Sequence, residues 1–318
     1  MSRILVAEIS GKRPGDSKAR ATELFDIAYD HLIISNNADG YETDWPIVMV
    51  PDDYMAWYKE NVKTSDNAWY APMNRSYAIK YAREHGYDYL IQLDDNITTL
   101  EISYMIKDAD GVIRRYRSVN KPGMINDYIE MLCCVLENTN AGMAGCELNG
   151  IAVPDGSFLK ERYCYSLFAL DLASCPDLFH GDFEDDIEYR LKLTEMGLPA
   201  IMVCPLRYGK TGQKSAKDET GNRAAYTAAG LKRGEHMRVI HGDIYSCGFS
   251  GRTASVMSKM DGKYFKHKIK PVKVGAIIKN KEAIERKMLE IFAKYATPYG
   301  DKVIIKEKGG GKNKLTEA

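Results

Sequence analysis

Apolar residues in the first third of the chain follow two alternating patterns. Short apolar runs, which predict buried strands, are separated by segments in which apolar residues recur every three or four positions, as on one face of a helix. Strands are expected at residues 4–7, 31–35, 47–50 and 87–93, and helices at residues 19–29 and 73–85. Strands that alternate with helices in this way predict an α/β fold with parallel pairing in an open, doubly wound sheet.

The rest of the chain continues this mixture. Two apolar runs at residues 102–107 and 112–117 flank the turn-forming residues 108–111 and predict a β-hairpin. Further helices are expected at residues 126–138, 186–196 and 281–295, and further strands at residues 162–170, 200–204 and 237–240. The polar, glycine-containing residues 208–222 predict a mobile loop.

The composition is that of an ordinary globular protein. The chain has 318 residues, of which 45% are apolar and 28% charged, so a sizeable core is expected. No apolar run reaches the roughly 18 residues of a membrane span, and the first run is too short for a signal peptide, so we expect a cytoplasmic protein that does not use a membrane. The seven cysteines are odd in number and form no Cys-x-x-Cys pair, which argues against a disulfide framework and a zinc site.

The charges are unevenly distributed although they sum to zero. Residues 252–318 hold 17 of the 44 basic residues but only 7 of the 44 acidic ones. A basic end on an acidic body indicates a polyanionic partner, most simply a nucleic acid. A solvated lysine-rich surface is the alternative that charge counts alone leave open.

Acidic residues follow the strand at residues 87–93 without a break. Asp94, Asp95 and Asn96 stand where that strand ends, and ligands of open parallel sheets collect at the carboxyl ends of strands. Two adjacent carboxylates repel each other unless a cation lies between them, and Mg²⁺ or Mn²⁺ accepts such oxygen ligands while sharing them with phosphates. The alternative is a turn or a helix cap, for which these residue types are also suited.

Three further segments make up an ordered set with this acidic motif. Residues 75–79, Arg-Ser-Tyr-Ala-Ile, precede it, residues 184–188, Glu-Asp-Asp-Ile-Glu, begin a later helix, and residues 10–14, Ser-Gly-Lys-Arg-Pro, follow the first strand. Over residues 3–245 this order resembles the GT-A glycosyltransferases. The resemblance implies a GT-A, Rossmann-like fold with a mostly parallel central sheet flanked by helices. It further implies a catalytic domain at residues 1–250, before a basic helical extension at 251–305 and a disordered tail at 306–318.

The same resemblance implies roles for individual residues. The base would be Asp186, or Asp185 if the motif is shifted by one residue. Mn²⁺ or Mg²⁺ would be held by Asp94, Asp95, Asn96 and His241, and the nucleotide-sugar donor would be bound by Ser10, Arg13, Arg75, Asp94 and Lys210. The pattern departs from the family at Asn96, where an aspartate is usual, and at Ser76, where an asparagine is usual. The first departure puts in doubt which atoms hold the metal.

Two parts of the chain bear on the identity of the acceptor: a basic segment at residues 207–238 and the basic C-terminal end. The cations of this segment that we assign to nucleic-acid binding are Lys214, Lys217, Arg223, Lys232 and Arg233. Together with the core, these features resemble the phage TET-associated glycosyltransferases, which modify 5-hydroxymethylcytosine in phage DNA. The resemblance implies transfer of glucose from UDP-glucose to the hydroxymethyl group of a flipped-out base, in the host cytoplasm.

Other functions fit parts of this pattern. A glycosyltransferase acting on a glycan or lipid precursor would share the core but would have no use for DNA. A non-catalytic nucleic-acid-binding protein would use the basic end alone, and would leave Asp94, Asp95 and Asp186 without a purpose. A sugar nucleotidyltransferase would require a glycine-rich G-x-G-T-R-type loop after the first strand, and residues 8–15 do not supply one.

Overall fold

The computed structural model describes most of the chain. The described residues are 2–11, 21–62, 70–107, 110, 112–149, 158–180, 184–210, 234–250, 259–260, 263–269, 275–296, 303–304 and 316–317. Arg13 and the five cations assigned to nucleic-acid binding lie outside these residues. So does the tail expected at 306–318, apart from residues 316–317.

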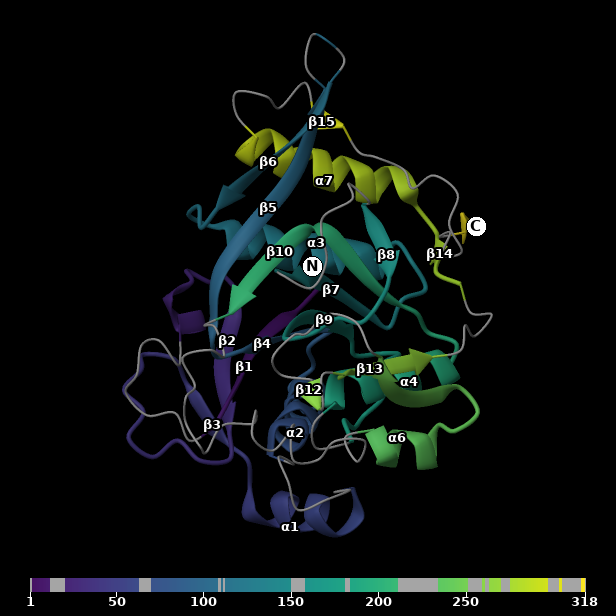
Figure 1. The fold of residues 1–318 in the computed structure, drawn as a ribbon. Coiled ribbons are helices and arrows are strands. Elements are labelled where there is room, and N and C mark those ends of the chain that lie inside the picture. Colours follow the sequence, from purple (N-terminus) through teal and green to yellow (C-terminus); the bar gives the residue numbers. More distant parts are fainter. Residues whose placement is uncertain are drawn as a thin grey trace.

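The described residues form a central sheet of eleven strands (Figure 1). In sheet order nine strands are β15 (Val303–Ile304), β5 (Ile97–Lys107), β10 (Ala200–Lys210), β7 (Met143–Leu148), β9 (Leu167–Asp171), β4 (Tyr89–Asp94), β1 (Ile4–Ser10), β2 (Asp30–Ser35) and β3 (Ile47–Met49). Two more are attached to this path, β6 (Ile113–Val119) on β5 and β8 (Leu159–Glu161) on β10. The sheet therefore extends well beyond the strands that the sequence predicted.

The directions of the strands locate an edge suited to ligands. β1 pairs in parallel with both β2 and β4, β2 with β3, and β10 with β7. β9 is antiparallel to β4 on one side and to β7 on the other, so six of the seven strands from β3 to β10 run in one direction. The chain winds outward from β1 to β3 and then returns to place β4 on the other side of β1. In open α/β sheets, ligands bind outside the carboxyl ends of the strands at such a reversal of winding, which here lies between β1 and β4.

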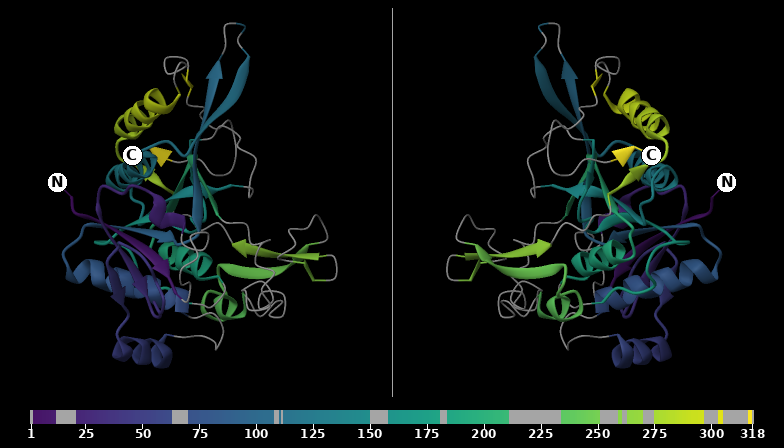
Figure 2. Two further views of the ribbon diagram at one scale, coloured as in Figure 1. Left: turned by 90° about the vertical axis from the view of Figure 1, so that its left-hand side faces the viewer. Right: turned by 90° about the vertical axis from the view of Figure 1, so that its right-hand side faces the viewer.

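Helices cover both faces of the sheet, so the predicted α/β architecture is confirmed. The helices are α1 (Asp52–Asn61), α2 (Tyr70–Glu84), α3 (Met124–Glu137), α4 (Asp185–Glu195), α6 (Glu235–Ile240) and α7 (Lys281–Tyr295), with a 3₁₀ turn η1 (Ala21–Leu24). One core contains α1, α2 and α4, and the other contains α3 and α7. Figure 2 shows α3 and α7 on the opposite side of the sheet from α2. Along β1, Leu5 and Ala7 face the first core and Val6 faces the second, as strand alternation requires.

The C-terminal part of the chain packs onto this framework. In α7, Ile284, Met288, Ile291 and Phe292 are buried in the same core as α3. The boundary expected at residue 250 falls between two paired strands, β11 (Tyr245–Ser250) and β13 (Lys263–Ile269). β12 (Lys259–Met260) completes that small sheet, and β14 (Ile277–Ile278) pairs with β16 (Thr316–Glu317). Among the described residues, no helix has both the length and the apolar character needed to cross a bilayer.

Two predicted elements are wrong for tertiary reasons. The helix expected at residues 19–29 is only the 3₁₀ turn η1 in its described part, where Phe25 donates its backbone N–H to the Thr22 carbonyl (3.1 Å) and Thr22 donates its own to the Asp95 carbonyl (3.1 Å). The strand expected at residues 237–240 is the helix α6, where Met237 is buried against α4 while Val239 is exposed. Of the strand expected at 162–170, only residues 167–170 lie in a strand, β9, which begins directly after Ser166, whose φ is 50°.

Candidate functional site

The acidic motif forms a tight turn at the carboxyl end of β4. Asp94 is the last residue of the strand, and Asp95 and Asn96 connect it to β5. Thr22 fixes this turn, since its hydroxyl donates to the Asp94 carbonyl (2.6 Å) and accepts the N–H of Ile97 (3.1 Å). The side chains of the turn therefore have a defined backbone beneath them, which a catalytic or binding site needs.

Ser10 joins the turn from the neighbouring strand. It ends β1, and its hydroxyl donates to Oδ2 of the buried Asp95 (2.7 Å) and also contacts the Tyr41 hydroxyl (2.8 Å). Asn74 of α2 donates to the Ser10 carbonyl (3.1 Å). The predicted residues Ser10 and Asp95 are thus brought together at the place where the winding of the sheet reverses.

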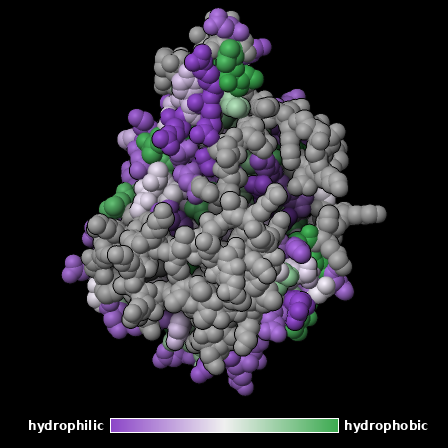
Figure 3. All heavy atoms as spheres, in the orientation of Figure 1, coloured by the Kyte–Doolittle hydropathy of each residue, from purple (hydrophilic) through white to green (hydrophobic). Residues whose placement is uncertain are grey.

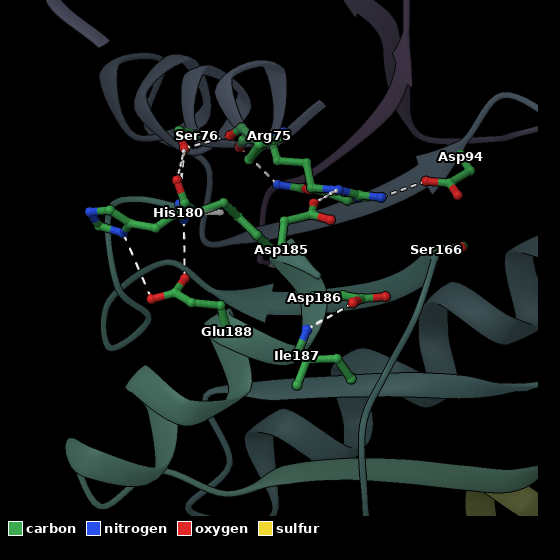
Figure 4. A network of polar contacts seen from close by, with 12 residues as sticks. Arg75, Ser76, Asp94, Ser166, His180, Asp185, Asp186, Ile187 and Glu188 are labelled. Atoms are coloured by element: carbon green, nitrogen blue, oxygen red, sulfur yellow. Dashed lines mark hydrogen bonds and ion pairs between the residues drawn. The ribbon is translucent and has the colours of Figure 1, made fainter. Parts of the chain in front are cut away.

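Arg75 connects the acidic turn with the start of α4. Its guanidinium contacts Asp94 (2.5 Å) and Asp185 (3.0 Å), and it donates to Oε1 of Gln92 (3.2 Å). Figure 4 shows the arginine between the two carboxylates, which come from residues more than 90 positions apart. The Arg75 side chain is only 7% exposed, so this charge depends on its partners. The predicted acidic motifs are therefore close to each other.

Lys210 reaches Asp94 from the end of β10. Its ammonium is ion-paired with Asp94 and donates to the hydroxyl of Ser166 (2.7 Å). Burial alone would raise the pKa of Asp94, but Lys210 and Arg75 together hold that pKa well below the usual range for a carboxyl. Asp94 is therefore ionised at any physiological pH, and two cations lie next to it.

The two aspartates that begin α4 lie in a different electrostatic environment. Burial raises the pKa of Asp185, although Arg75 opposes the shift. Burial raises the pKa of Asp186 well above the usual range, and the negative charges of Asp185 and Glu184 add to this effect. Asp186 is half-buried, and its carboxylate accepts the N–H of Ile187 (2.8 Å). A carboxylate with a raised pKa that solvent can still reach is suited to accept a proton.

His241 belongs to a separate cluster and is not brought to the acidic turn. Its Nε2 contacts Glu188 (3.0 Å) and its Nδ1 contacts Glu195 (2.9 Å), both on α4. Glu188 is fully buried and also accepts the backbone N–H of His180 (3.1 Å). Since carboxylates occupy both ring nitrogens, the expectation that His241 joins Asp94 and Asp95 as a metal ligand is not met in this arrangement.

The acidic turn fits a divalent cation only if the ion takes further ligands from elsewhere. Among the described residues, no three His, Cys, Asp or Glu side chains are grouped so that they could hold a metal ion. Both oxygens of Asp94 face Arg75 and Lys210. However, Oδ1 of Asn96 is buried and has no hydrogen-bond partner in the described structure. Mg²⁺ is commonly bound by one or two side chains together with substrate phosphates, so Asp95 and Asn96 fit an ion shared with a diphosphate.

Gln92 and Ser166 are among the residues of the site that were not predicted from the sequence. Gln92 is fully buried on β4 and donates to the Arg75 carbonyl (3.0 Å) as well as accepting from its side chain. A glutamine within the apolar run 90–93 is a visible signal, because a buried amide requires partners. Ser166 positions Lys210 and accepts the N–H of Asp94 on its carbonyl (2.9 Å). Its positive φ has no signature in the sequence.

Comparisons with known proteins give little beyond this geometry. No model of a protein family matches the chain, and no curated protein matches it. The solved structures similar to it include a nucleotide-diphospho-sugar transferase from Desulfovibrio desulfuricans G20, with 13% identity, a TM-score of 0.35, and coverage of 76% of this chain and 99% of the other. Another is glucosyl-3-phosphoglycerate synthase from Mycobacterium tuberculosis with Mn²⁺, UDP and phosphoglyceric acid, with 9% identity, a TM-score of 0.45, and coverage of 86% and 89%.

Proposed function

We propose that the protein is a metal-dependent glycosyltransferase that moves a sugar, in particular glucose, from a UDP-sugar to a hydroxyl group. The observation that carries the proposal is the link made by Arg75 between the acidic turn at β4 and the start of α4. In this proposal the cations beside the acidic turn would receive the charged leaving group, and Asp186, next to Asp185, would accept a proton. These are the two requirements of a displacement at an anomeric carbon.

The donor would bind at the carboxyl ends of β1 and β4. Ser10 stands at the end of β1, and the cations Lys210 and Arg75 would provide positive charge for the diphosphate. Arg13 follows Ser10 closely in the chain and is assigned to the same subsite from the sequence alone. A bound Mg²⁺ or Mn²⁺ would neutralise charge on the diphosphate as the bond to the sugar breaks. Asp95 and Asn96 would hold that ion.

Asp186 would act on the acceptor. Ionised Asp186 takes the proton of the acceptor hydroxyl while the hydroxyl oxygen forms a bond to the anomeric carbon and the nucleoside diphosphate leaves with its bonding electrons. The raised pKa of Asp186, caused by burial and by Asp185, makes it a stronger base than an ordinary aspartate. Asp185 is tied to Arg75 and would serve mainly to place α4. This assignment applies to a reaction that inverts configuration.

The acceptor that we propose is 5-hydroxymethylcytosine in DNA. The support is the resemblance of the sequence and the excess of cations in residues 252–318, together with the basic residues between 207 and 238. A cytoplasmic location follows from that acceptor. The cations Lys214, Lys217, Arg223, Lys232 and Arg233 are assigned to the DNA backbone from the sequence, and they lie outside the described residues.

The decisive experiment combines donor, metal and acceptor. Purified protein is incubated with Mn²⁺, UDP-glucose and other nucleotide sugars, and duplex DNA that contains 5-hydroxymethylcytosine. The DNA is then digested and its nucleosides are weighed. We expect a gain of one hexose, abolished by EDTA and reduced by a factor of about 10² to 10⁴ in Asp186→Asn, the range typical of a lost general base.

A matched variant separates catalysis from folding. Glu60→Gln removes an exposed carboxylate on α1 that is not among the residues of the site, and should leave the rate unchanged. Metal-dependent release of UDP without a change in the DNA would support the assignment as a glycosyltransferase but exclude DNA as its acceptor. Glycans and lipid precursors would then be tested as acceptors. If UDP-sugars neither bind nor turn over, the proposed function is wrong.

A further inference from the structure

The small sheet that contains β11 and β13 presents one of its faces to α4. Tyr245 of β11 and Ile269 of β13 are paired in register, and both pack in one apolar cluster with Ile187 and Leu191 of α4. Because side chains alternate along a strand, His267 lies on the same face of the sheet as Ile269. This histidine of the C-terminal part of the chain therefore faces α4.

The imidazole of His267 contacts both Glu184 and Tyr245. Its Nε2 is 3.2 Å from Oε2 of Glu184, and its Nδ1 is 2.7 Å from the hydroxyl of Tyr245. Because an ionised carboxylate only accepts hydrogen bonds, Nε2 carries the hydrogen and donates it to Glu184. The Tyr245 hydroxyl can donate to Nδ1 of a neutral ring and accept from Nδ1 of a charged one. The contact with Glu184 thus fits both protonation states of the histidine.

Glu184 directs its carboxylate away from the usual task of its position. It is the N-cap residue of α4, yet within the described chain its side chain makes no capping hydrogen bond to the helix. Glu184 is buried, and a buried carboxylate requires a donor or a cation. His267 supplies the donor from a strand that follows more than 80 residues later in the chain. The small sheet is therefore tied to the first turn of α4, which Arg75 holds from the other side of the site.

The charge of Glu184 acts on the proposed base, Asp186, two residues further along. Burial raises the pKa of Asp186, the charges of Asp185 and Glu184 raise it further, and the charge of Arg75 lowers it. A donor or a cation that reaches Glu184 offsets part of the negative charge in this group. The partner of Glu184 is therefore part of the electrostatic balance around Asp186.

Further titratable groups near Asp186 come from other segments. Burial raises the pKa of three tyrosines there, and the charge of the aspartate adds to it, so that they stay neutral: Tyr163, Tyr165 and Tyr208. Arg190, one turn further along α4, holds its guanidinium 4.4 Å from the ring centre of Tyr163. The hydroxyls of these tyrosines bring no charge that would replace the effect of His267 on Glu184.

We infer that His267 is a positioning residue for the proposed base: its contact with Glu184 fixes the first turn of α4 and offsets part of the negative charge that Glu184 directs at Asp186. This role rests on the proposed function, which assigns the proton transfer to Asp186. It gives β13, which lies beyond the boundary expected at residue 250, a part in the reaction. Removal of the donor makes the acidic group harder to ionise, so the pKa of Asp186 should then rise further.

The test measures the titration of Asp186 in the full chain. The carboxyl carbons of the aspartates are labelled with ¹³C and followed by NMR against pH, and the signal of Asp186 is identified by its absence in Asp186→Asn. For His267→Leu we expect the midpoint to rise by about 1 pH unit, the lower end of the effect of a neighbouring charge. His267→Gln retains an N–H that can reach Glu184, and its midpoint should stay close to that of wild type.

A double-variant comparison shows whether the effect passes through Glu184. Glu184→Gln removes a negative charge next to Asp186 and should lower the midpoint. In that background His267→Leu should change the midpoint by less than about 0.3 pH unit, because the residue through which it acts is gone. Arg115→Leu controls for a general loss of positive charge. It removes an exposed cation from the β5–β6 hairpin, whose surface is largely hydrophilic (Figure 3), and should leave the midpoint unchanged.

The pattern of midpoints decides the role of His267. A rise in His267→Leu that disappears in the Glu184→Gln background supports it. An unchanged midpoint, or an equal rise in both backgrounds, overturns it. If His267→Leu does not fold, as judged by circular dichroism, Glu184→Gln decides, and an unchanged midpoint in that variant overturns the role.

The titration requires no sugar transfer, so it is independent of the proposed function. If wild type neither binds nor turns over UDP-sugars, the proposed function fails, while the effect of His267 on the acidity of Asp186 is still measured. In active enzyme, the apparent pKa of kcat/KM for the acceptor should rise in His267→Leu by as much as the NMR midpoint, with KM for the UDP-sugar unchanged. A pH profile that does not follow the NMR midpoint overturns the part of His267 in the reaction.

Discussion

Arg75 lies between two carboxylates that the chain supplies from distant segments. Its contacts to Asp94 and Asp185 are buried, and Gln92 satisfies a further donor. A buried charge is tolerated only where such partners exist, and removal of one partner leaves the others uncompensated. The positions of both acidic motifs therefore depend on a single guanidinium.

Replacing that guanidinium should destabilise the whole protein. Arg75→Met keeps much of the length of the side chain but leaves Asp185 without its cation, while Asp94 retains Lys210. We expect a loss of about 3 kcal/mol in the free energy of unfolding, measured by urea denaturation. The control Lys80→Met removes an exposed lysine from the same helix and should stay within about 0.5 kcal/mol of wild type. Equal effects of the two variants would contradict a bridging role for Arg75.

The pH dependence of the reaction should reflect Asp186. A base accepts a proton only when it is ionised, and burial next to Asp185 raises the pKa of Asp186 well above the usual range. Activity, expressed as kcat/KM for the acceptor, should therefore increase with pH, and the apparent pKa of this increase should lie clearly above the ordinary aspartate pKa of about 4. An apparent pKa at the ordinary aspartate value would point to another base.

The sequence predicts the acidic residues of the site better than their supports. Asp94, Asp95, Asp185 and Asp186 are recognisable because each group stands where a predicted strand ends or a predicted helix begins. Ser166 is not recognisable, since its role depends on a positive φ that only the packed chain imposes. The contacts of His241 with Glu188 and Glu195 were not predicted, because local sequence does not indicate which of several carboxylates a histidine will meet.

At the scale of elements, α4 is held in place at two positions along its length. Arg75 holds its first turn through Asp185, and the cluster around Glu188 holds its middle. That cluster joins α4 to the residues before it through His180 and to the end of α6 through His241. Because Asp186 lies on this helix, its direction depends on both attachments.

The contribution of His241 to stability should be lost at alkaline pH. Although burial opposes it, contact with Glu188 and Glu195 raises the pKa of His241 above its unfolded value of about 6.5. The stabilising charge is therefore fully present below pH 6.5 and disappears as the pH rises through the raised value. His241→Gln should lower the urea midpoint more at pH 6 than at pH 9. A larger effect at pH 9 would reverse the assigned sign.

Elements with strong local patterns were predicted well, and those fixed by tertiary contacts were not. The helix expected at residues 281–295 has these bounds in the structure, and the hairpin at 102–117 is formed by β5 and β6. Helix α2 ends before Gly86, whose φ of 71° suits glycine. The segments at 19–29 and 237–240 failed because hydrogen bonds of η1 and burial of Met237 outweigh local preference.

At the scale of the whole molecule, α7 and α3 share one apolar core with β5. Met288 is fully buried there, whereas its neighbour Leu289 is 44% exposed. The basic C-terminal part therefore contributes apolar surface to the same core that supports the proposed catalytic site.

A pair of adjacent substitutions tests this shared core. Met288→Ala should cost roughly 2–5 kcal/mol in the free energy of unfolding, because it leaves a cavity in the core, and unfolding should remain a single transition. Leu289→Ala should cost far less, since half-exposed surface is involved. The measurement is urea denaturation followed by both tryptophan fluorescence and circular dichroism. Two separated transitions in Met288→Ala would indicate that α7 belongs to an independently folding unit.

The order of the strands has a consequence for synthesis of the protein. β4 and β5 are consecutive in the chain, but β9, β7 and β10 lie between them in the sheet. A ribosome that has released the β5–β6 hairpin must add about 80 more residues before β10 arrives to pair with β5, which takes several seconds at usual rates of elongation. During that interval the inner edge of β5 is open to other chains. The nascent chain is therefore most exposed to aggregation, and most dependent on chaperones, between the emergence of β5 and that of β10.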